Sequence, residues 1–166
     1  MRVAVLTISD AGSRGAREDL SGSVAAEWAG ANGGEVVARA IVGDDSVAIV
    51  QQLVAWCDHD TADLVLTTGG TGLCPTDVTP EATRVAIERE APGIAERLRA
   101  VTGADFPRAY LGRGVAGVRA RTLIVNLPGS TSGVRDSLAA LAPIVAHAVA
   151  IVRDQPTEHS AGRASA

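Results

Sequence analysis

Leu64-Val-Leu-Thr-Thr-Gly-Gly-Thr-Gly-Leu-Cys-Pro-Thr-Asp-Val-Thr-Pro-Glu81 is the stretch that decides how this chain folds. Its apolar beginning, residues 64–66, is typical of a buried strand. Its end, Thr79-Pro80-Glu81, predicts the start of a helix, because proline is favoured in the first helical turn. The polar segment between them is therefore a loop that leads from a strand directly into a helix.

The composition of this loop favours a bound ligand. Glycines at 69, 70 and 72 let a backbone approach a ligand closely and adopt positive φ without a Cβ penalty. Hydroxyl groups that can donate to phosphate come from Thr67, Thr68 and Thr71. Asp77 adds a fixed negative charge, so a phosphorylated ligand with a metal ion beside it is one interpretation, and a tight turn without a ligand is the other. The spacing matches neither the P-loop nor the dinucleotide-binding glycine motif.

Strands and helices alternate along the rest of the chain. Short β-branched apolar runs predict strands, and apolar residues three or four apart predict helices. The predicted strands are 3–8, 35–42, 63–67 and 122–127. The predicted helices are 20–31, 47–57, 80–90, 94–101 and 133–152. This alternation indicates βαβ units and a parallel sheet, which is the α/β class.

Three details of this pattern can be checked directly. In the helix 80–90 we expect Ala82, Val85 and Ala86 to point inward. Between 103 and 120 the glycines at 112, 114 and 117 weaken any prediction of a strand. Pro143 lies within the last helix and should kink it.

Composition limits the class of protein. The chain has 166 residues, 46% of them apolar and 20% charged, which suits one globular domain. With a net charge of −4 and no run of Lys or Arg, a nucleic-acid surface is not expected. The two cysteines, Cys57 and Cys74, form no metal-type pair. We find no signal peptide and expect no apolar run long enough to span a bilayer, which predicts a soluble cytoplasmic protein.

Other predicted strands also end in polar loops, where open α/β sheets bind ligands. Asp10 follows the first strand and is either a ligand contact or a turn residue. Asp44 and Asp45 follow the second; at least one should cap the next helix. The turn Pro128-Gly129-Ser130 follows the last strand and joins a helix N-terminus, which suits an anion site or simple capping.

Taken together and in order, these motifs carry a resemblance. Thr-Thr-Gly-Gly-Thr-Gly at 67–72, Asp77-Val-Thr-Pro-Glu81 and Asn126-Leu-Pro-Gly-Ser130 resemble the MoaB/Mog family of molybdenum-cofactor biosynthesis. The N-terminal Thr7-Ile-Ser-Asp10 fits the same family. The likeness covers residues 1–153 as one molybdopterin-binding domain and implies a three-layer sandwich around a mostly parallel sheet. Residues 154–166 lack apolar periodicity, and we expect a disordered tail.

The resemblance also implies roles for single residues. Asp10 and Ser13 would help to hold the pterin substrate. Asp44 matches an aspartate that serves catalysis in the family, but Gly43 stands where the family usually has proline. The chain has Gly112-Arg113 where relatives often have Ser-Arg, so a serine contact would be missing. Arg113 would reach a phosphate or a neighbouring subunit. The resemblance also implies a homotrimer or a multiple of it.

The activity implied is adenylylation of molybdopterin with Mg-ATP, which releases pyrophosphate. Asp44 and Asp77 would be the catalytic, Mg²⁺-holding residues. The backbone amides of Gly69, Gly70 and Gly72 would bind nucleotide phosphates, and Asp10, Thr71 and the turn Pro128-Gly129-Ser130 would position the substrate. Two alternatives stay open: a non-catalytic molybdopterin carrier, and a related domain that hydrolyses a nucleotide. No Ser-His-Asp or Cys-His set is present, so covalent acyl chemistry is not expected.

Overall fold

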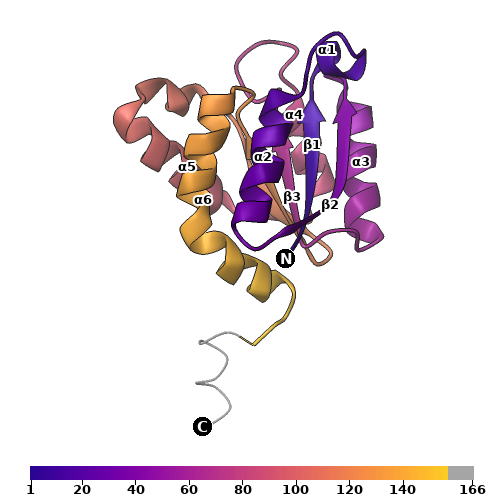
Figure 1. Cartoon of the computed structure of the whole chain (residues 1–166), viewed down its shortest axis with the longest axis vertical. Coiled ribbons are helices and arrows are strands. Elements are labelled where there is room, and N and C mark those ends of the chain that lie inside the picture. Colours follow the sequence, from indigo (N-terminus) through magenta and orange to yellow (C-terminus); the bar gives the residue numbers. More distant parts are fainter. Residues whose placement is uncertain (157–166) are drawn as a thin grey trace.

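A six-stranded sheet forms the centre of the molecule in the computed structural model, which describes residues 1–156 (Figure 1). The strand order across the sheet is β2-β1-β3-β6-β5-β4. The strands are β1 (Arg2–Ile8), β2 (Glu35–Val42), β3 (Leu64–Thr68), β4 (Arg89–Glu90), β5 (Ala116–Arg119) and β6 (Thr122–Leu127). The first four strands in the spatial order are parallel, whereas β5 and β4 are antiparallel to their neighbours. The mostly parallel sheet expected from the sequence is confirmed.

Helices cover both faces of this sheet. They are α1 (Asp10–Ser13), α2 (Leu20–Ala31), α3 (Ser46–Asp58), α4 (Thr79–Ala86), α5 (Pro92–Asp105), the 3₁₀ helix η1 (Pro107–Leu111) and α6 (Thr131–Val152). One apolar cluster joins the sheet to α2, α5 and α6, and a second joins it to α3 and α4. The fold is therefore the expected three-layer sandwich. Most of the expected tail, residues 157–166, lies outside the described residues.

The alternation of side chains along β1 explains why two cores exist. Val3 and Val5 belong to the first cluster, Ala4 and Leu6 to the second, and all four are fully buried. A parallel strand with helices on both faces has a continuous apolar run as its sequence, and β1 has such a run.

The predicted helix 80–90 is too long. α4 ends at Ala86, because Ile87 adopts an extended backbone with φ −74° and ψ 151°. The chain then pairs with β5, where the Glu88 amide donates to the Val118 carbonyl oxygen. Ala82 and Ala86 are buried as expected, but Val85 is 71% exposed, so its inward placement is wrong.

A strand does lie between 103 and 120, where the glycines had weakened the signal for one. α5 continues to Asp105, η1 follows, and β5 occupies 116–119. Gly117 lies within β5. Its lack of a side chain is explained by close contacts, because a Cβ there would be 2.6 Å from Ile87 Cδ1 and 2.7 Å from the Arg89 carbonyl oxygen. This glycine permits close packing of β5 against the chain after α4 and does not interrupt the strand.

The last helix, α6, runs for 22 residues with Pro143 inside it, and Figure 1 shows it changing direction between its orange and yellow parts. The predicted kink is confirmed. By length and hydropathy α6 would qualify as a membrane span, contrary to the expectation that no apolar run is long enough. Its residues Leu138, Leu141 and Val145 are buried against the sheet, which is the position of a core helix.

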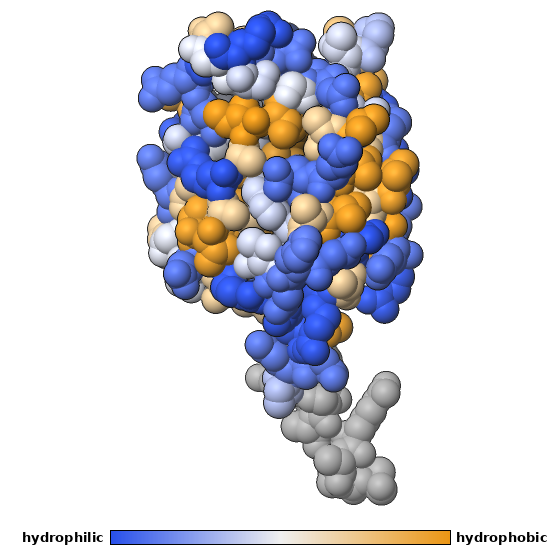
Figure 2. All heavy atoms as spheres, turned by 90° about the vertical axis from the view of Figure 1, so that its right-hand side faces the viewer, coloured by the Kyte–Doolittle hydropathy of each residue, from blue (hydrophilic) through white to orange (hydrophobic). Residues whose placement is uncertain are grey.

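One side of the molecule is formed by the edge strand β2 and by α3, and Figure 2 shows it space-filled. Hydrophobic residues appear there in groups among hydrophilic ones. Val37 and Ile41 on β2 and Val47 on α3 are exposed.

The sheet has four parallel strands side by side, β2, β1, β3 and β6. In open sheets of this kind ligands bind at the edge where the parallel strands end, so the loops after these four strands are the ones to inspect for a site.

Candidate functional site

Four loops meet at the carboxyl-terminal edge of the parallel strands, and they are the loops singled out in the sequence. The loops after β3 and β6 are joined where Thr68 Oγ1 donates to the Pro128 carbonyl oxygen at 2.7 Å. A Cβ on Gly129 would lie 3.3 Å from Gly69 Cα, so the two turns pack backbone against backbone. The Gly-rich loop is thereby placed between the loops after β1 and β2 and the N-terminus of α6.

The glycines at 69 and 70 are required by the turn itself. Their φ angles are +100° and +61°, in the region that side-chain-bearing residues avoid. A Cβ on Gly69 would also lie 2.2 Å from the Ile8 carbonyl oxygen. Thr79 closes the turn: its hydroxyl donates to the Gly69 carbonyl oxygen at 2.9 Å, and its amide donates to that of Gly70 at 3.1 Å. The start of α4 is thus bonded directly to the end of β3.

Asp10 and Asp44 hold each other's backbone. The Asp10 amide donates to Asp44 Oδ2 at 3.1 Å, and the Asp44 amide donates to Asp10 Oδ1 at 2.9 Å. A Cβ on Gly43 would lie 2.9 Å from Asp10 Oδ1, so glycine at this position gives the Asp10 carboxylate room. Asp45 is the N-cap of α3, as expected, and accepts from the Ala48 amide at 2.8 Å. Asp44 is therefore not needed as the cap, and its carboxylate lies beside Gly70 of the Gly-rich loop.

Asp77 is fixed by its own turn, after the last glycine of the Gly-rich loop. Its Oδ2 accepts from the Cys74 amide at 2.8 Å, and its own amide donates to the Cys74 carbonyl oxygen at 2.9 Å. Asp77 Oδ2 lies 2.8 Å from where a Cβ on Gly72 would be, and Asp44 Oδ1 lies 3.3 Å from where a Cβ on Gly70 would be. Both carboxylates therefore border the same three-residue segment, although they are 33 positions apart in the chain (77 − 44).

The fit of this pair to a metal ion follows from its chemistry. Within residues 1–156, no group of three or more His, Cys, Asp or Glu side chains is gathered as a complete ligand set. Two carboxylates completed by water and substrate phosphate oxygens are, however, a usual way for proteins to bind Mg²⁺. Asp44 and Asp77 therefore suit an ion that arrives with a phosphorylated substrate better than a permanently held one.

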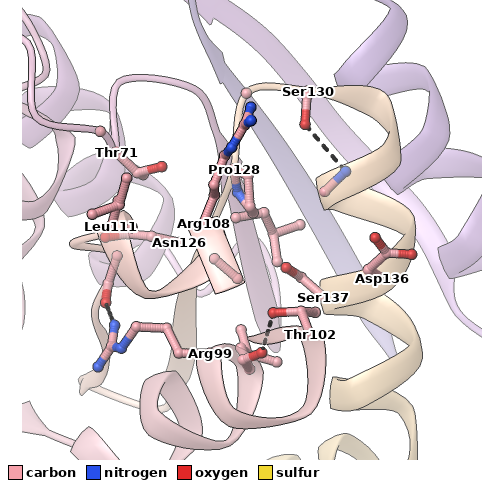
Figure 3. Close-up of a pocket in the computed structure, with 18 of the residues that line it drawn as sticks. Thr71, Arg99, Thr102, Arg108, Leu111, Asn126, Pro128, Ser130, Asp136 and Ser137 are labelled. Atoms are coloured by element: carbon pink, nitrogen blue, oxygen red, sulfur yellow. Dashed lines mark hydrogen bonds between the residues drawn. The ribbon is translucent and has the colours of Figure 1, made fainter. Parts of the chain in front are cut away.

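Next to the Gly-rich loop lies a cavity of about 530 Å³, a size typical of small-molecule sites. Figure 3 shows Thr71 and Leu111 on one side of it and Asp136 and Ser137, from α6, on the other. The predicted residues that line it are Gly70, Thr71, Gly72, Asp77, Pro128, Gly129 and Ser130. Asp10, Ser13, Asp44 and Gly69 are not among the lining residues.

The polar groups on the far walls of this cavity were not foreseen from the sequence. They come from α5, η1 and α6: Arg99, Thr102, Arg108, Asp136 and Ser137. Two are already engaged, since Arg99 Nη1 donates to the Gly114 carbonyl oxygen at 2.8 Å and the Thr102 hydroxyl donates to that of Leu98 at 2.7 Å. The remaining wall is largely apolar, with Ala95 and Leu98 among its residues. Such walls suit a flat heterocycle whose polar edge meets a few fixed groups.

Two predicted contacts have local hydrogen bonds. The Ser13 hydroxyl donates to the Asp10 carbonyl oxygen at 3.0 Å within α1. Ser130 is the N-cap of α6, and its hydroxyl oxygen accepts from the Gly133 amide at 3.1 Å. Capping at Ser130 is therefore confirmed, whereas the ligand contacts of both serines stay predictions.

Asn126 organises the floor of the site from within the core. Its Nδ2 donates to the hydroxyls of Thr67 and Thr83, both at 2.9 Å, and its Oδ1 accepts from the Val115 amide at 3.1 Å. It is only 4% exposed. One amide group thus joins β3, α4, β6 and the segment before β5, and a polar residue inside the apolar run 122–127 was the sequence signal for it.

Arg113 is bonded to the Gly-rich loop and to α4, and its contact with a phosphate or a second subunit stays a prediction. Its guanidinium donates to the carbonyl oxygens of Gly72 and Asp77 and to the carboxylate of Glu81. Its backbone amide donates to the Thr71 carbonyl oxygen at 2.9 Å. The Arg113 guanidinium also lowers the pKa of Glu81 through this hydrogen bond.

Comparisons with known proteins identify the family of this chain. The chain is 37% identical over 158 residues to the molybdopterin adenylyltransferase of Helicobacter pylori strain J99, covering 92% of this chain and 88% of that protein. It is 37% identical over 151 residues to the molybdenum cofactor synthesis protein cinnamon of Drosophila melanogaster, which covers 90% of this chain. The chain spans 25% of the length of that larger protein.

A solved structure is similar throughout. The molybdopterin biosynthesis enzyme MoaB of Thermus thermophilus has a TM-score of 0.88 and 48% sequence identity, covering 93% of this chain and 98% of that chain. The family described as "Probable molybdopterin binding domain" matches residues 4–147. This chain therefore belongs to the MoaB/Mog family of molybdopterin-binding domains in molybdenum cofactor biosynthesis.

Proposed function

We propose that this protein is a nucleotidyltransferase that adenylylates molybdopterin, using ATP and releasing pyrophosphate. The observation that carries the proposal is that Asp44 and Asp77 both border the Gly70–Gly72 segment, and that this segment and Asp77 line a cavity large enough for a pterin. The names of the relatives support the same reaction. Phosphoryl chemistry of this kind depends on positioning and on charge neutralisation, and it needs no nucleophile from the protein.

The reaction forms one bond and breaks one bond. An oxygen of the terminal phosphate of molybdopterin attacks the α-phosphorus of ATP, and the bond from that phosphorus to the bridging oxygen breaks, so that pyrophosphate leaves. Asp44 and Asp77 would hold Mg²⁺, which when bound neutralises negative charge on the transferring group. The amides of Gly69, Gly70 and Gly72 would bind nucleotide phosphates, because successive backbone amides in a turn of this kind can form an anion-binding concavity.

We assign the cavity to the pterin of molybdopterin. Thr71 and the turn Pro128-Gly129-Ser130 line the cavity together with Asp77, so they would hold the substrate near its phosphate. On the opposite wall, Asp136 would accept hydrogen bonds from the N–H groups of the pterin edge, and the apolar residues would exclude water from its face. Asp10 would act through Asp44, because each carboxylate accepts from the other's amide.

The proposal is tested by incubating the protein with molybdopterin, ATP and Mg²⁺ and measuring adenylylated product and pyrophosphate. Asp77→Asn and Asp44→Asn keep an oxygen that accepts the loop hydrogen bonds but remove the charge, and each should lower the rate by about 100-fold or more. Asp45→Asn is the matched control, because asparagine also caps a helix, and its rate should be unchanged.

Two results would contradict this assignment. If the wild-type protein binds molybdopterin tightly but forms no product, it is a carrier. If ATP is consumed at the same rate without molybdopterin, the chain is a nucleotide hydrolase. Two further expectations are tested separately: the homotrimer that the family implies by light scattering of the purified protein, and the cytoplasmic location expected from the sequence by cell fractionation.

A further inference from the structure

The loop that carries Asp77 has little apolar burial to hold it in place. The side chains of residues 73–76 between the last glycine and Asp77 are all exposed, including Leu73 at 66%. Within the loop, the hydrogen bonds between Cys74 and Asp77 fix the carboxylate relative to its own turn. They do not join that turn to the rest of the molecule. The bonds from Thr79 to the carbonyl oxygens of Gly69 and Gly70 do so beyond Asp77, and a further contact holds the loop itself.

Arg113 makes that contact at both ends of the loop. Its Nε donates to the Gly72 carbonyl oxygen at 2.6 Å, and its Nη2 donates to the Asp77 carbonyl oxygen at 2.5 Å. Its Nη1 donates to Glu81 Oε1 at 2.5 Å, which ties the same guanidinium to the first turn of α4. All three guanidinium nitrogens are therefore used, and the side chain is only 33% exposed.

We propose that Arg113 is a positioning residue, whose guanidinium holds the 72–77 loop so that the Asp77 carboxylate faces the reacting phosphates. This inference rests on the proposed adenylyl transfer. Arg113 contacts neither the cavity nor the carboxylate oxygens of Asp77; it acts through the carbonyl oxygens on either side of the loop. Its neighbours Leu111, Gly112 and Gly114 do line the cavity, so the same segment forms the substrate wall and the tether of the loop.

The geometry demands arginine in particular. A planar fork of five donors can reach three acceptors in different directions, whereas a lysine ammonium on a flexible chain has a single nitrogen. Arg113→Lys keeps the positive charge near Glu81 but loses bonds to at least one end of the loop. The backbone bond from residue 113 to the Thr71 carbonyl oxygen survives any of these substitutions, so that only the side-chain tether is removed.

The test compares Arg113→Ala, Arg113→Lys and Arg84→Ala in the full chain. Arg84 is the matched control, because its nearest Glu81 contact is 3.8 Å and it makes no hydrogen bond to the loop carbonyls among the described residues. We expect kcat to fall by about 100-fold in both Arg113 variants, since a displaced catalytic group of this kind costs about that factor. The Mg²⁺ concentration at half-maximal rate should rise, KM for molybdopterin should stay within about twofold, and Arg84→Ala should behave like the wild type.

A second measurement does not depend on activity. Hydrogen exchange of the backbone amides in residues 73–78 should be at least about tenfold faster in Arg113→Ala and Arg113→Lys than in the wild type, while exchange in β3 and β6 stays the same. Full activity of Arg113→Lys would overturn the inference, because charge alone would then suffice. Unchanged loop exchange in Arg113→Ala would also overturn it. If the wild type forms no adenylylated product while the exchange result holds, the proposed reaction fails and the tether stands.

Discussion

The turn at Gly70 can be tested by substitution with alanine, with a second glycine as its control. Gly70 has φ +61°, and a Cβ there would lie 2.4 Å from the Thr79 hydroxyl oxygen. Gly33, between α2 and β2, has φ +73°, but a Cβ there would have no atom within 4 Å. The two substitutions share the cost of a left-handed backbone, and only Gly70→Ala adds a close contact.

The expected magnitudes follow from these contacts. A left-handed alanine costs about 1–2 kcal/mol at either position. At Gly70 the new methyl group must also displace the buried Thr79 hydroxyl from the Gly69 carbonyl oxygen, which removes a hydrogen bond of about 1 kcal/mol. We therefore expect a loss of unfolding free energy of about 1–2 kcal/mol for Gly33→Ala and about 2–3 kcal/mol for Gly70→Ala.

Urea denaturation at a fixed protein concentration measures both losses, and adenylylation by the folded variants measures the effect on the site. Gly70→Ala should also be slower in the reaction, because the added Cβ would press on the Asp44 carboxylate at 3.3 Å. Gly33→Ala should react like the wild type. If the two variants lose equal stability and keep equal rates, the turn has room for a side chain, and close packing is not what requires glycine at position 70.

The remaining predictions concern titration and thiol reactivity. Burial raises the pKa of Asp63, but hydrogen bonds from Arg2 outweigh burial and the net pKa is lowered. The stability gained is present above the unfolded pKa of about 4 and is lost as pH falls through the folded value. In Asp63→Asn, the free energy of unfolding measured with urea should therefore fall less steeply as the pH drops below about 4. The same dependence on pH in the variant and the wild type would contradict this. A thiol reagent should label Cys74 in the native protein, since it is exposed and a hydrogen bond from Thr76 lowers its pKa. Cys57 should react only after unfolding, because burial raises its pKa to about 11. Peptide mass analysis locates the label, and rapid labelling of Cys57 in the native protein would contradict this.

Much of the fold followed from local pattern. The runs 3–8 and 122–127 are buried on both faces, so nearly every residue in them carries the same apolar signal. The exception was β5, where Gly117 resembled a loop residue. Its glycine is explained by Ile87 and Arg89, which approach it from a distant part of the chain, and no local pattern reports such an approach.

The candidate site could be predicted only where its signals are local in the sequence. Glycines and carboxylates mark the strand ends because the turn geometry and the charge are local properties. The role of Arg113 is not local, since its acceptors lie between 32 and 41 positions earlier in the chain. The same holds for Asp136 and Ser137, which belong to an ordinary helix in the sequence and reach the cavity only because α6 packs beside the sheet.

The mutual hold of Asp10 and Asp44 has a consequence for interpreting mutational data. Because each aspartate shapes the backbone of the other, loss of Asp10 would disturb the opposite loop without removing any group that borders the cavity. Mutagenesis that measures only the loss of turnover would group Asp10 with the residues that take part in the chemistry. Asparagine at position 10 still offers an oxygen to the Asp44 amide while alanine offers none, so the contrast between these two replacements separates scaffolding from chemistry.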